Sequence, residues 1–387
     1  MIAALFMASL NLRPAISSIS PVLEGIRSDL GMNAFLASLL TAIPVLCMGC
    51  LSPLSVRLSR LMGMERSIAW SLVLIGGGTL LRLFASSTAL LLLTALLTGV
   101  GVAIMGPLLS GFIKKHFARS TPLMIALYAM ALSLGATLGA SLSAPLDTAW
   151  HSWQSALAFW AVLALAAIPV WGRAARESSH ASPEEGTERS PESKMPWTNK
   201  KAWLLTVHFG FMALVFYSLL GWLPPIMESE GFSNLEAGML LTLFSAVQIP
   251  SGMVLQMLLG RYPSRLFWLL ASSSLQLIGL VLLLYAALPW LAAPLCGFSS
   301  GMLFALGTML PIEAASNPRE AASWAAMTQS VGYLIAALGP LLVGWINDAT
   351  HEFRLAIFGL IGVTLGLMFI QWRIWPRRPK AIFGTSL

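Results

Sequence analysis

Twelve long apolar stretches follow one another along the chain, and they limit its possible folds more than any other feature. Each is near or above the about 20 residues that a helix needs to cross the hydrocarbon core of a bilayer. Backbone groups in lipid must find hydrogen-bond partners within their own segment, so each stretch predicts a transmembrane helix. The expected fold class is therefore an all-α membrane protein with twelve transmembrane helices. The stretches lie at residues 2–23, 33–56, 66–84, 88–113, 121–146, 153–173, 201–226, 233–259, 265–287, 289–312, 321–346 and 353–374.

A polar segment in the middle of the chain separates the first six stretches from the last six. Residues 176–200 hold three prolines and five glutamates. This composition cannot bury much apolar surface, so the segment is interpreted as a flexible linker. We therefore expect an N-terminal six-helix bundle at 1–175, a linker at 176–200 and a C-terminal six-helix bundle at 201–387.

Positive charge is distributed unevenly between the two sides of the predicted membrane. Of the 23 Lys and Arg residues, 19 fall on the linker side, whereas only Arg27, Arg82 and Arg354 fall in loops on the opposite side. Cytoplasmic loops carry this excess of basic residues, so the linker and both termini are predicted to be cytoplasmic. The expected location is the plasma (inner) membrane, as a multi-pass protein. The net charge of +7 then reports topology, and it requires no nucleic-acid partner.

One cation lies deep inside a predicted membrane helix. At 1.5 Å per residue, Arg13 is roughly 18 Å from the start of the first span, past the middle of an apolar core about 30 Å thick. All sixteen acidic residues fall in loops, in the linker or at the edges of spans, so no carboxylate is available to neutralise it. Such an arginine suits an anionic or electron-rich ligand. The alternative is a guanidinium bound by helix carbonyls at a kink caused by Pro14.

The two halves of the chain also repeat a short pattern. An L-L-T run at 39–41 is followed by Pro44, and a second L-L-T run at 240–242 is followed by Pro250. With the central linker, this echo indicates two parallel six-helix repeats with a substrate site between them, near the middle of the membrane. That arrangement resembles the major facilitator superfamily.

Several longer runs carry a more specific resemblance. They are LNLRP at 10–14 with SP at 20–21, LLTAIPV at 39–45, LR at 81–82, GWLP at 221–224 and MTQSVG at 327–332. Together these runs resemble the cyanate and nitroimidazole porter family (CynX/NimT type). The resemblance implies a secondary transporter that moves a small solute, such as a cyanate-like anion or a nitroimidazole-like compound, by alternating access. One departure is Arg60, which stands where the superfamily usually carries an aspartate in the loop between the second and third spans.

Eight polar or aromatic residues within the predicted spans are candidates for binding the solute. Asn11, Trp222 and Gln329 lie inside the runs that match the family. For most of the others, hydrogen bonding between packed helices is the alternative role. The candidates are Arg13, Asn11, Gln329, Tyr128, Tyr217, Trp222, Gln248 and Tyr333.

Two further residues are candidates for supporting roles. His208 lies about seven residues into the seventh span and could carry a proton, the alternative being a neutral histidine bonded to a backbone carbonyl. Arg82 lies near the outer end of the third span, where it would attract anions to an outer vestibule. Its alternative role is an arginine that extends to the membrane interface.

Other functional classes find little support in the sequence. No P-loop, dinucleotide fingerprint, zinc-protease motif or nucleophile elbow occurs, so we expect no enzyme, no catalytic residue and no cofactor. Cys47 and Cys50 form C-x-x-C inside a span and are interpreted as packing residues, with no metal site.

Two alternative functions remain: a multidrug-type efflux pump for neutral or acidic compounds, and a non-transporting membrane sensor. Uniport, anion exchange and proton coupling through His208 stay open, and the expected partners are a small-molecule solute and the lipid bilayer, with the chain as a monomer.

Overall fold

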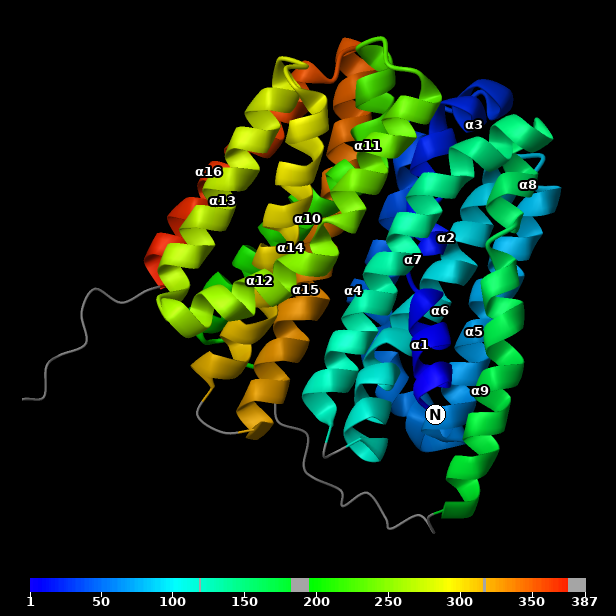
Figure 1. The fold of residues 1–387 in the computed structure, drawn as a ribbon, viewed down its shortest axis with the longest axis vertical. Helices are drawn as coiled ribbons and strands as arrows, with labels where there is room; N and C mark the ends of the chain where they lie inside the picture. The colour runs from blue at the N-terminus through cyan, green and yellow to red at the C-terminus, as the bar shows by residue number, and fades with distance from the viewer. Residues whose placement is uncertain (118–119, 182–194, 316–317, 375–387) are drawn as a thin grey trace, which may run out of the picture.

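The computed structural model describes residues 1–387 except 118–119, 182–194, 316–317 and 375–387. Every regular element in these described residues is a helix, and twelve helical segments are long and apolar enough to cross a membrane. The expected all-α fold with twelve membrane helices is confirmed. Figure 1 shows the N-terminal and C-terminal halves of the chain as two groups of helices that stand side by side.

The N-terminal half runs from α1 to α9. Residues 176–181, which we expected in the linker, continue its last helix, and residues 182–194 lie outside the described residues. The elements are α1 (Ile2–Leu10), α2 (Pro14–Ser17), the 3-10 helix η1 (Ser20–Val22), α3 (Leu23–Leu30), α4 (Ala34–Met62), α5 (Met64–Leu81), the 3-10 helix η2 (Arg82–Phe84), α6 (Thr88–His116), α7 (Thr121–Trp150), α8 (Trp153–Ala158) and α9 (Ala161–Ala181).

The C-terminal half runs from α10 to α16 and supplies the other six spans. Its elements are α10 (Lys200–Ser229), α11 (Asn234–Ala246), α12 (Gln248–Arg261), α13 (Arg265–Leu284), α14 (Pro289–Ala314), α15 (Pro318–Thr350) and α16 (Arg354–Ile374).

Three spans are divided by turns, the sixth at residues 159–160 and the first and eighth near their middles. The first is divided into α1, α2, η1 and α3, with turns at residues 11–13 and 18–19. The first turn directly precedes Pro14, which lacks an amide hydrogen and clashes with the preceding turn of a helix. The eighth span is divided at Val247, where α11 ends and α12 begins. These interruptions free backbone groups in the middle of spans, where side chains can bind them.

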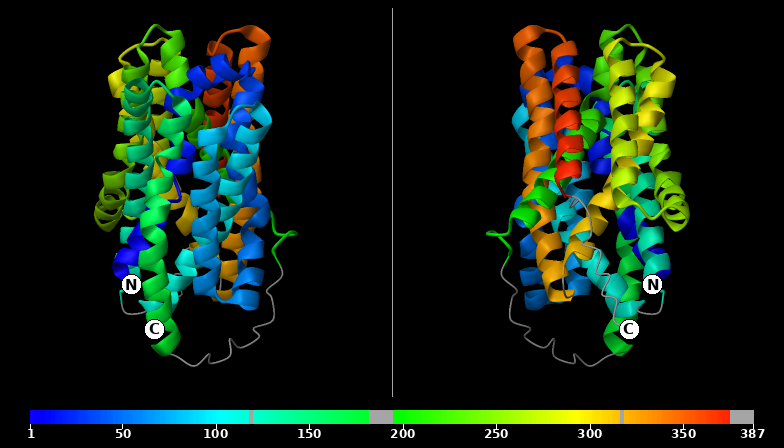
Figure 2. Two further views of the ribbon diagram at one scale, coloured as in Figure 1. Left: turned by 90° about the vertical axis from the view of Figure 1, so that its right-hand side faces the viewer. Right: turned by 90° about the vertical axis from the view of Figure 1, so that its left-hand side faces the viewer.

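The spans alternate in direction, so the turns between them gather on two faces of the molecule. We call the face that holds Met1 the N-face, and the opposite face the distal face (Figures 1 and 2). The distal face holds the turns at residues 31–33, 85–87, 151–152, 230–233, 285–288 and 351–353.

The two halves meet along two pairs of long helices. In one pair α15 packs against α4, and in the other α11 packs against α7, while α15 also packs against α10 within its own half. Glycines allow the close approach of α15 to α4. A Cβ atom at Gly344 would lie 2.5 Å from the carbonyl oxygen of Ala34, and one at Gly49 would lie 2.8 Å from Leu334. Side chains at these positions would force the halves apart.

Candidate functional site

The turn between α1 and α2 places Arg13 at the centre of the first span. Arg13 is the residue that caps the N-terminus of α2, with φ −110° and ψ −36°, and Pro14 is the first residue of the helix. On the preceding residues, Asn11 Nδ2 donates to the carbonyl oxygens of Met7, at 2.8 Å, and Leu163 in α9, at 3.2 Å. Asn11 therefore ties the end of α1 to its own half, and its side chain is buried.

Arg13 reaches across to the C-terminal half of the chain. Its Nη1 atom donates a hydrogen bond to Tyr217 Oη in α10 over 3.4 Å. The guanidinium carbon also lies 5.3 Å from the centre of the Phe216 ring and 5.7 Å from that of Tyr217, within the range of a cation–π contact. The charge is thus held by aromatic groups that belong to the other half.

Three tyrosines lie near this cation. Tyr128 of α7, Tyr217 of α10 and Tyr333 of α15 all interact with the charge of Arg13. The Tyr217 and Tyr333 rings meet edge to face with 6.3 Å between centres, and Tyr217 Oη lies 3.8 Å from Met48 Sδ in α4. The chain has only five tyrosines, so three of them gather at one membrane-embedded arginine.

Arg13 forms no ion pair with a carboxylate in the part of the chain that the structure describes. A cation at this depth costs at least about 2.5 kcal/mol when it has no partner. Cation–π contacts and one long hydrogen bond offset only part of that cost. An anionic or electron-rich solute would supply hydrogen-bond acceptors for the other N–H donors of the guanidinium. We call Arg13, Tyr128, Phe216, Tyr217 and Tyr333 the central site.

Four of the expected binding residues make no hydrogen bond with Arg13 in this structure. Trp222 Nε1 donates to the carbonyl oxygen of Pro340 over 3.1 Å, and its buried ring packs within the C-terminal half. Gln248 Nε2 donates to the carbonyl oxygen of Phe244 over 3.1 Å, at the break in the eighth span. Gln329 is exposed on α15, one helical turn before Tyr333 and on the same side of that helix. Asn11, described above, makes backbone contacts.

The outer-vestibule role expected for Arg82 does not agree with the structure. Its side chain is completely buried, and its Nη2 atom donates to the carbonyl oxygen of Ala15 over 2.9 Å. The side chain points into the N-terminal half instead of out to the interface, because the broken first span offers it a backbone acceptor. His208 is also completely buried, with Nε2 at 3.4 Å from Gln371 Nε2 in α16.

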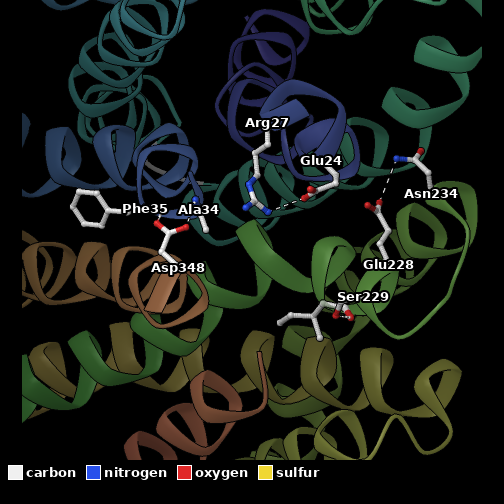
Figure 3. Close-up of polar contacts among 9 residues, drawn as sticks. Glu24, Arg27, Ala34, Phe35, Glu228, Ser229, Asn234 and Asp348 are labelled. Carbon is white, nitrogen blue, oxygen red and sulfur yellow. Dashed lines mark hydrogen bonds and ion pairs between the residues drawn. The ribbon is translucent and has the colours of Figure 1, made fainter. Parts of the chain in front are cut away.

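Sequence reasoning did not single out the residues that join the two halves at the distal face. Asp348, near the C-terminal end of α15, accepts hydrogen bonds from the backbone N–H groups of Ala34 at 2.6 Å and Phe35 at 2.7 Å (Figure 3). Asn33 accepts from the N–H of Leu36, so the first three N–H groups of α4 all have partners. An acidic residue in the last turn of a helix interacts unfavourably with the dipole of that helix. This unusual position was the one feature of the sequence that could have singled out Asp348.

Further contacts join the halves nearby. Ser20 Oγ donates to the carbonyl oxygen of Gly221 over 2.7 Å, and Asn234 Nδ2 donates to that of Pro21 over 2.7 Å. A surface pocket of about 490 Å³ lies beside them on the distal face, between the ends of α3, α10 and α15. It contains the Arg27–Glu24 ion pair, at 2.8 Å, and Glu228, whose Oε1 lies 3.3 Å from Asn234 Nδ2 (Figure 3). The distal ends of the two halves are therefore fastened together.

Comparison with known proteins places the chain in a family. The sequence profile of the Major Facilitator Superfamily matches residues 4–337. The chain is 32% identical to the 2-nitroimidazole transporter of Escherichia coli over 99% of its own length and 96% of the relative's. It is 34% identical to the cyanate transport protein CynX of the same organism, over 98% of each chain.

Solved structures agree with this fold. A bacterial homologue of the human lysosomal transporter Spinster, solved in an inward-facing and unoccupied conformation, superimposes with a TM-score of 0.75 at 15% identity, over 96% of each chain. The relatives are transporters and the helices suit a bilayer, so the chain is a multi-pass membrane protein with a transport function and is not an enzyme. The chain belongs to the major facilitator superfamily.

Proposed function

We propose that this chain is a secondary transporter that moves a small polar or anionic solute by alternating access, with Arg13 as the main solute-binding group. The observation that carries the proposal is the central site itself. A cation without a carboxylate partner in the described residues contacts Tyr217 and Phe216 of the opposite half, with Tyr128 and Tyr333 nearby. A solute with a carboxylate, a nitro group or a similar electron-rich group would bind the free guanidinium donors.

The relatives narrow the chemical class of solute. The two relatives transport 2-nitroimidazole and cyanate, which are both small and carry electron-rich atoms that accept hydrogen bonds. The aromatic rings at Arg13 would stack on a planar heterocycle, while the guanidinium would pair with its nitro group or with the charge of a linear anion. We therefore propose a cyanate-like anion or a nitroimidazole-like compound as the solute.

Alternating access is proposed from the distribution of contacts between the halves. Asp348, Ser20 and Asn234 each bind a backbone group of the opposite half at the distal face. We propose that this conformation is closed at the distal face, and that transport requires these contacts to break while the N-face closes. The halves would then rock about the central site as rigid units.

We also propose the topology and the domain limits. Residues 1–175 and 201–387 would form the two moving units, with 176–200 as the connection between them. We propose that the N-face, with both termini, lies in the cytoplasm, because cytoplasmic loops carry an excess of Lys and Arg. We propose that the monomer is sufficient for transport, because the central site is built within one chain.

The test is counterflow into vesicles that contain the purified protein, with labelled cyanate, 2-nitroimidazole and benzoate as separate probes. The wild type is expected to exchange at least one probe. Arg13→Ala and Arg13→Lys are both expected to lower the rate at least tenfold, because lysine offers a point charge in place of the planar fork of donors. Arg66→Met, which removes an exposed arginine from α5, is the matched control. Wild-type rates in either Arg13 variant, or no exchange of any probe, would overturn the proposal.

A further inference from the structure

Arg82 occupies an unusual position at the end of the third span. It lies in η2, which continues α5 to the distal face, and its neighbours Leu81 and Leu83 are exposed. An arginine at the end of a membrane helix normally extends its charged group towards the head groups. Arg82 instead turns inward and is completely buried. Some feature of the interior must therefore bind it.

That feature is a carbonyl group freed by the interruption of the first span. In a continuous helix, the carbonyl oxygen of Ala15 would accept from the N–H of Ile19. Here the N–H of Ile19 bonds to Ile16 at 3.3 Å, and the N–H of Ser18 bonds to Pro14 at 3.0 Å. Among the described residues, the bond to Ala15 comes from Arg82 Nη2, at 2.9 Å. The third span thus supplies the donor that the first span lacks.

The short helix α2 is also held by close packing against α7. A Cβ atom at Gly139 of α7 would lie 2.3 Å from Ser17 Oγ, and one at Gly135 would lie 2.4 Å from the carbonyl oxygen of Leu10. The short helix is therefore held both by packing against two glycines of α7 and by the guanidinium of Arg82. Only Pro14 separates Ala15 from Arg13, so the orientation of this one helical turn determines where Arg13 points.

We propose that Arg82 is a positioning residue, which clamps the broken first span so that Arg13 faces the phenols of the C-terminal half. This inference rests on the proposed function, in which Arg13 binds the solute. Arg82 does not bind solute itself, because its buried side chain leaves no space for a ligand. Its Nε and Nη1 atoms have no hydrogen-bond partner in the described part of the chain, so the polar contact of this side chain is the bond from Nη2 to Ala15.

The first test measures the clamp without any solute. Amide hydrogen exchange of the purified protein is followed by mass spectrometry over residues 11–20, in the wild type, Arg82→Met, Arg82→Lys and the control Arg66→Met. Arg82→Met is expected to speed exchange in this segment at least tenfold, and Arg82→Lys, which keeps one donor, less than that. Arg66→Met is expected to match the wild type. Unchanged exchange in Arg82→Met would overturn the clamp.

The second test asks whether Arg82 acts through Arg13. Binding of 2-nitroimidazole and of cyanate is measured on the purified protein for Arg82→Met, Arg13→Lys and the double variant. If Arg82 acts only by positioning Arg13, Arg82→Met should weaken binding at least fivefold when residue 13 is arginine. It should weaken binding less than twofold in the Arg13→Lys background. Equal effects in both backgrounds would overturn the positioning role. If the wild type binds neither probe, the proposed function is overturned, and the exchange measurement still decides on the clamp.

Discussion

The hydrogen bond from Arg13 to Tyr217 joins residues that are 204 positions apart and that belong to opposite halves of the chain. At 3.4 Å it is longer than a normal charged hydrogen bond, so it stabilises the guanidinium only weakly. A solute that approaches Arg13 can therefore replace this bond at small cost. Because Arg13 contacts both halves, binding of a solute to Arg13 would change the contact between them.

Tyr217→Phe tests the phenol apart from the ring. The variant keeps the ring under the guanidinium, at 5.7 Å, and loses the oxygen that bonds Arg13 and contacts Met48. Because the solute would replace this weak hydrogen bond, we expect KM for counterflow to stay within about threefold of the wild-type value. Tyr217→Ala also removes the ring and is expected to have a larger effect. Tyr285→Phe, at an exposed tyrosine, is the control. A wild-type KM in Tyr217→Ala would contradict this role.

Asp348 provides a second prediction, which concerns the closure of the distal face. Its carboxylate binds the first two N–H groups of α4, where the helix dipole also favours a negative charge. The loss of such a cap costs about 1–2 kcal/mol, so Asp348→Ala should shift the equilibrium about 5-fold to 30-fold towards a state open at the distal face. Asp348→Asn keeps an oxygen acceptor and should shift it less.

The shift can be measured through the accessibility of a buried position. Ser38 is buried on α4, and its Cβ lies 3.0 Å from the Cβ that a side chain at Gly344 would carry. Ser38→Cys should react faster with a membrane-impermeant maleimide when Asp348→Ala is added, and should keep its rate when the exposed Glu352 is changed to Gln. If Asp348→Ala leaves the labelling rate unchanged, the carboxylate does not hold the distal face closed.

The fold was predictable from the sequence because hydropathy and span length determine which segments can cross a bilayer. The ends and breaks of the individual spans were harder to predict from the sequence. The first span continues to Leu30, beyond the expected end at residue 23. The expected end was too early because α3 carries the charged residues Glu24 and Arg27, which interrupt the apolar stretch. The break in the eighth span at Val247 has a local cause that the sequence does carry. Pro250 clashes with the carbonyl group four residues earlier, at Ala246.

The central site was predictable in part. Arg13 and the tyrosines stood out because polar groups inside a membrane are costly and so are rarely without a role. Phe216 was not identified, because an aromatic residue in an apolar span carries no local signal. The pairing of Asp348 with α4 depends on how the two halves dock, and a single sequence does not contain that relationship. Arg82 was placed at the interface because the acceptor that turns it inward exists only in the folded first span.

Packing around the broken helix gives a third prediction. A Cβ at Gly139 would lie 2.3 Å from Ser17 Oγ, so Gly139→Ala should force α2 and α7 apart. Overpacking of this kind costs about 1–3 kcal/mol, and it should lower both the Tm of the purified protein and the rate of counterflow. Gly172→Ala in α9 is the matched control, because a Cβ there meets no atom within 4 Å. If Gly139→Ala and Gly172→Ala behave alike, α7 does not hold α2 in place.

His208 offers the last prediction, on whether a proton accompanies the solute through this residue. The side chain is completely buried between α10 and α16, where Gln371 Nε2 lies 3.4 Å from its Nε2 and also donates to Ser273 Oγ over 2.8 Å. The complete burial of the ring favours a structural role. We therefore expect His208→Gln to leave the pH dependence of counterflow between pH 5.5 and 8.5 unchanged. His208→Phe should lower Tm by about 2–5 °C through the loss of a buried polar partner, with the same pH profile. If both variants flatten the pH profile while Tm stays at the wild-type value, His208 carries the proton.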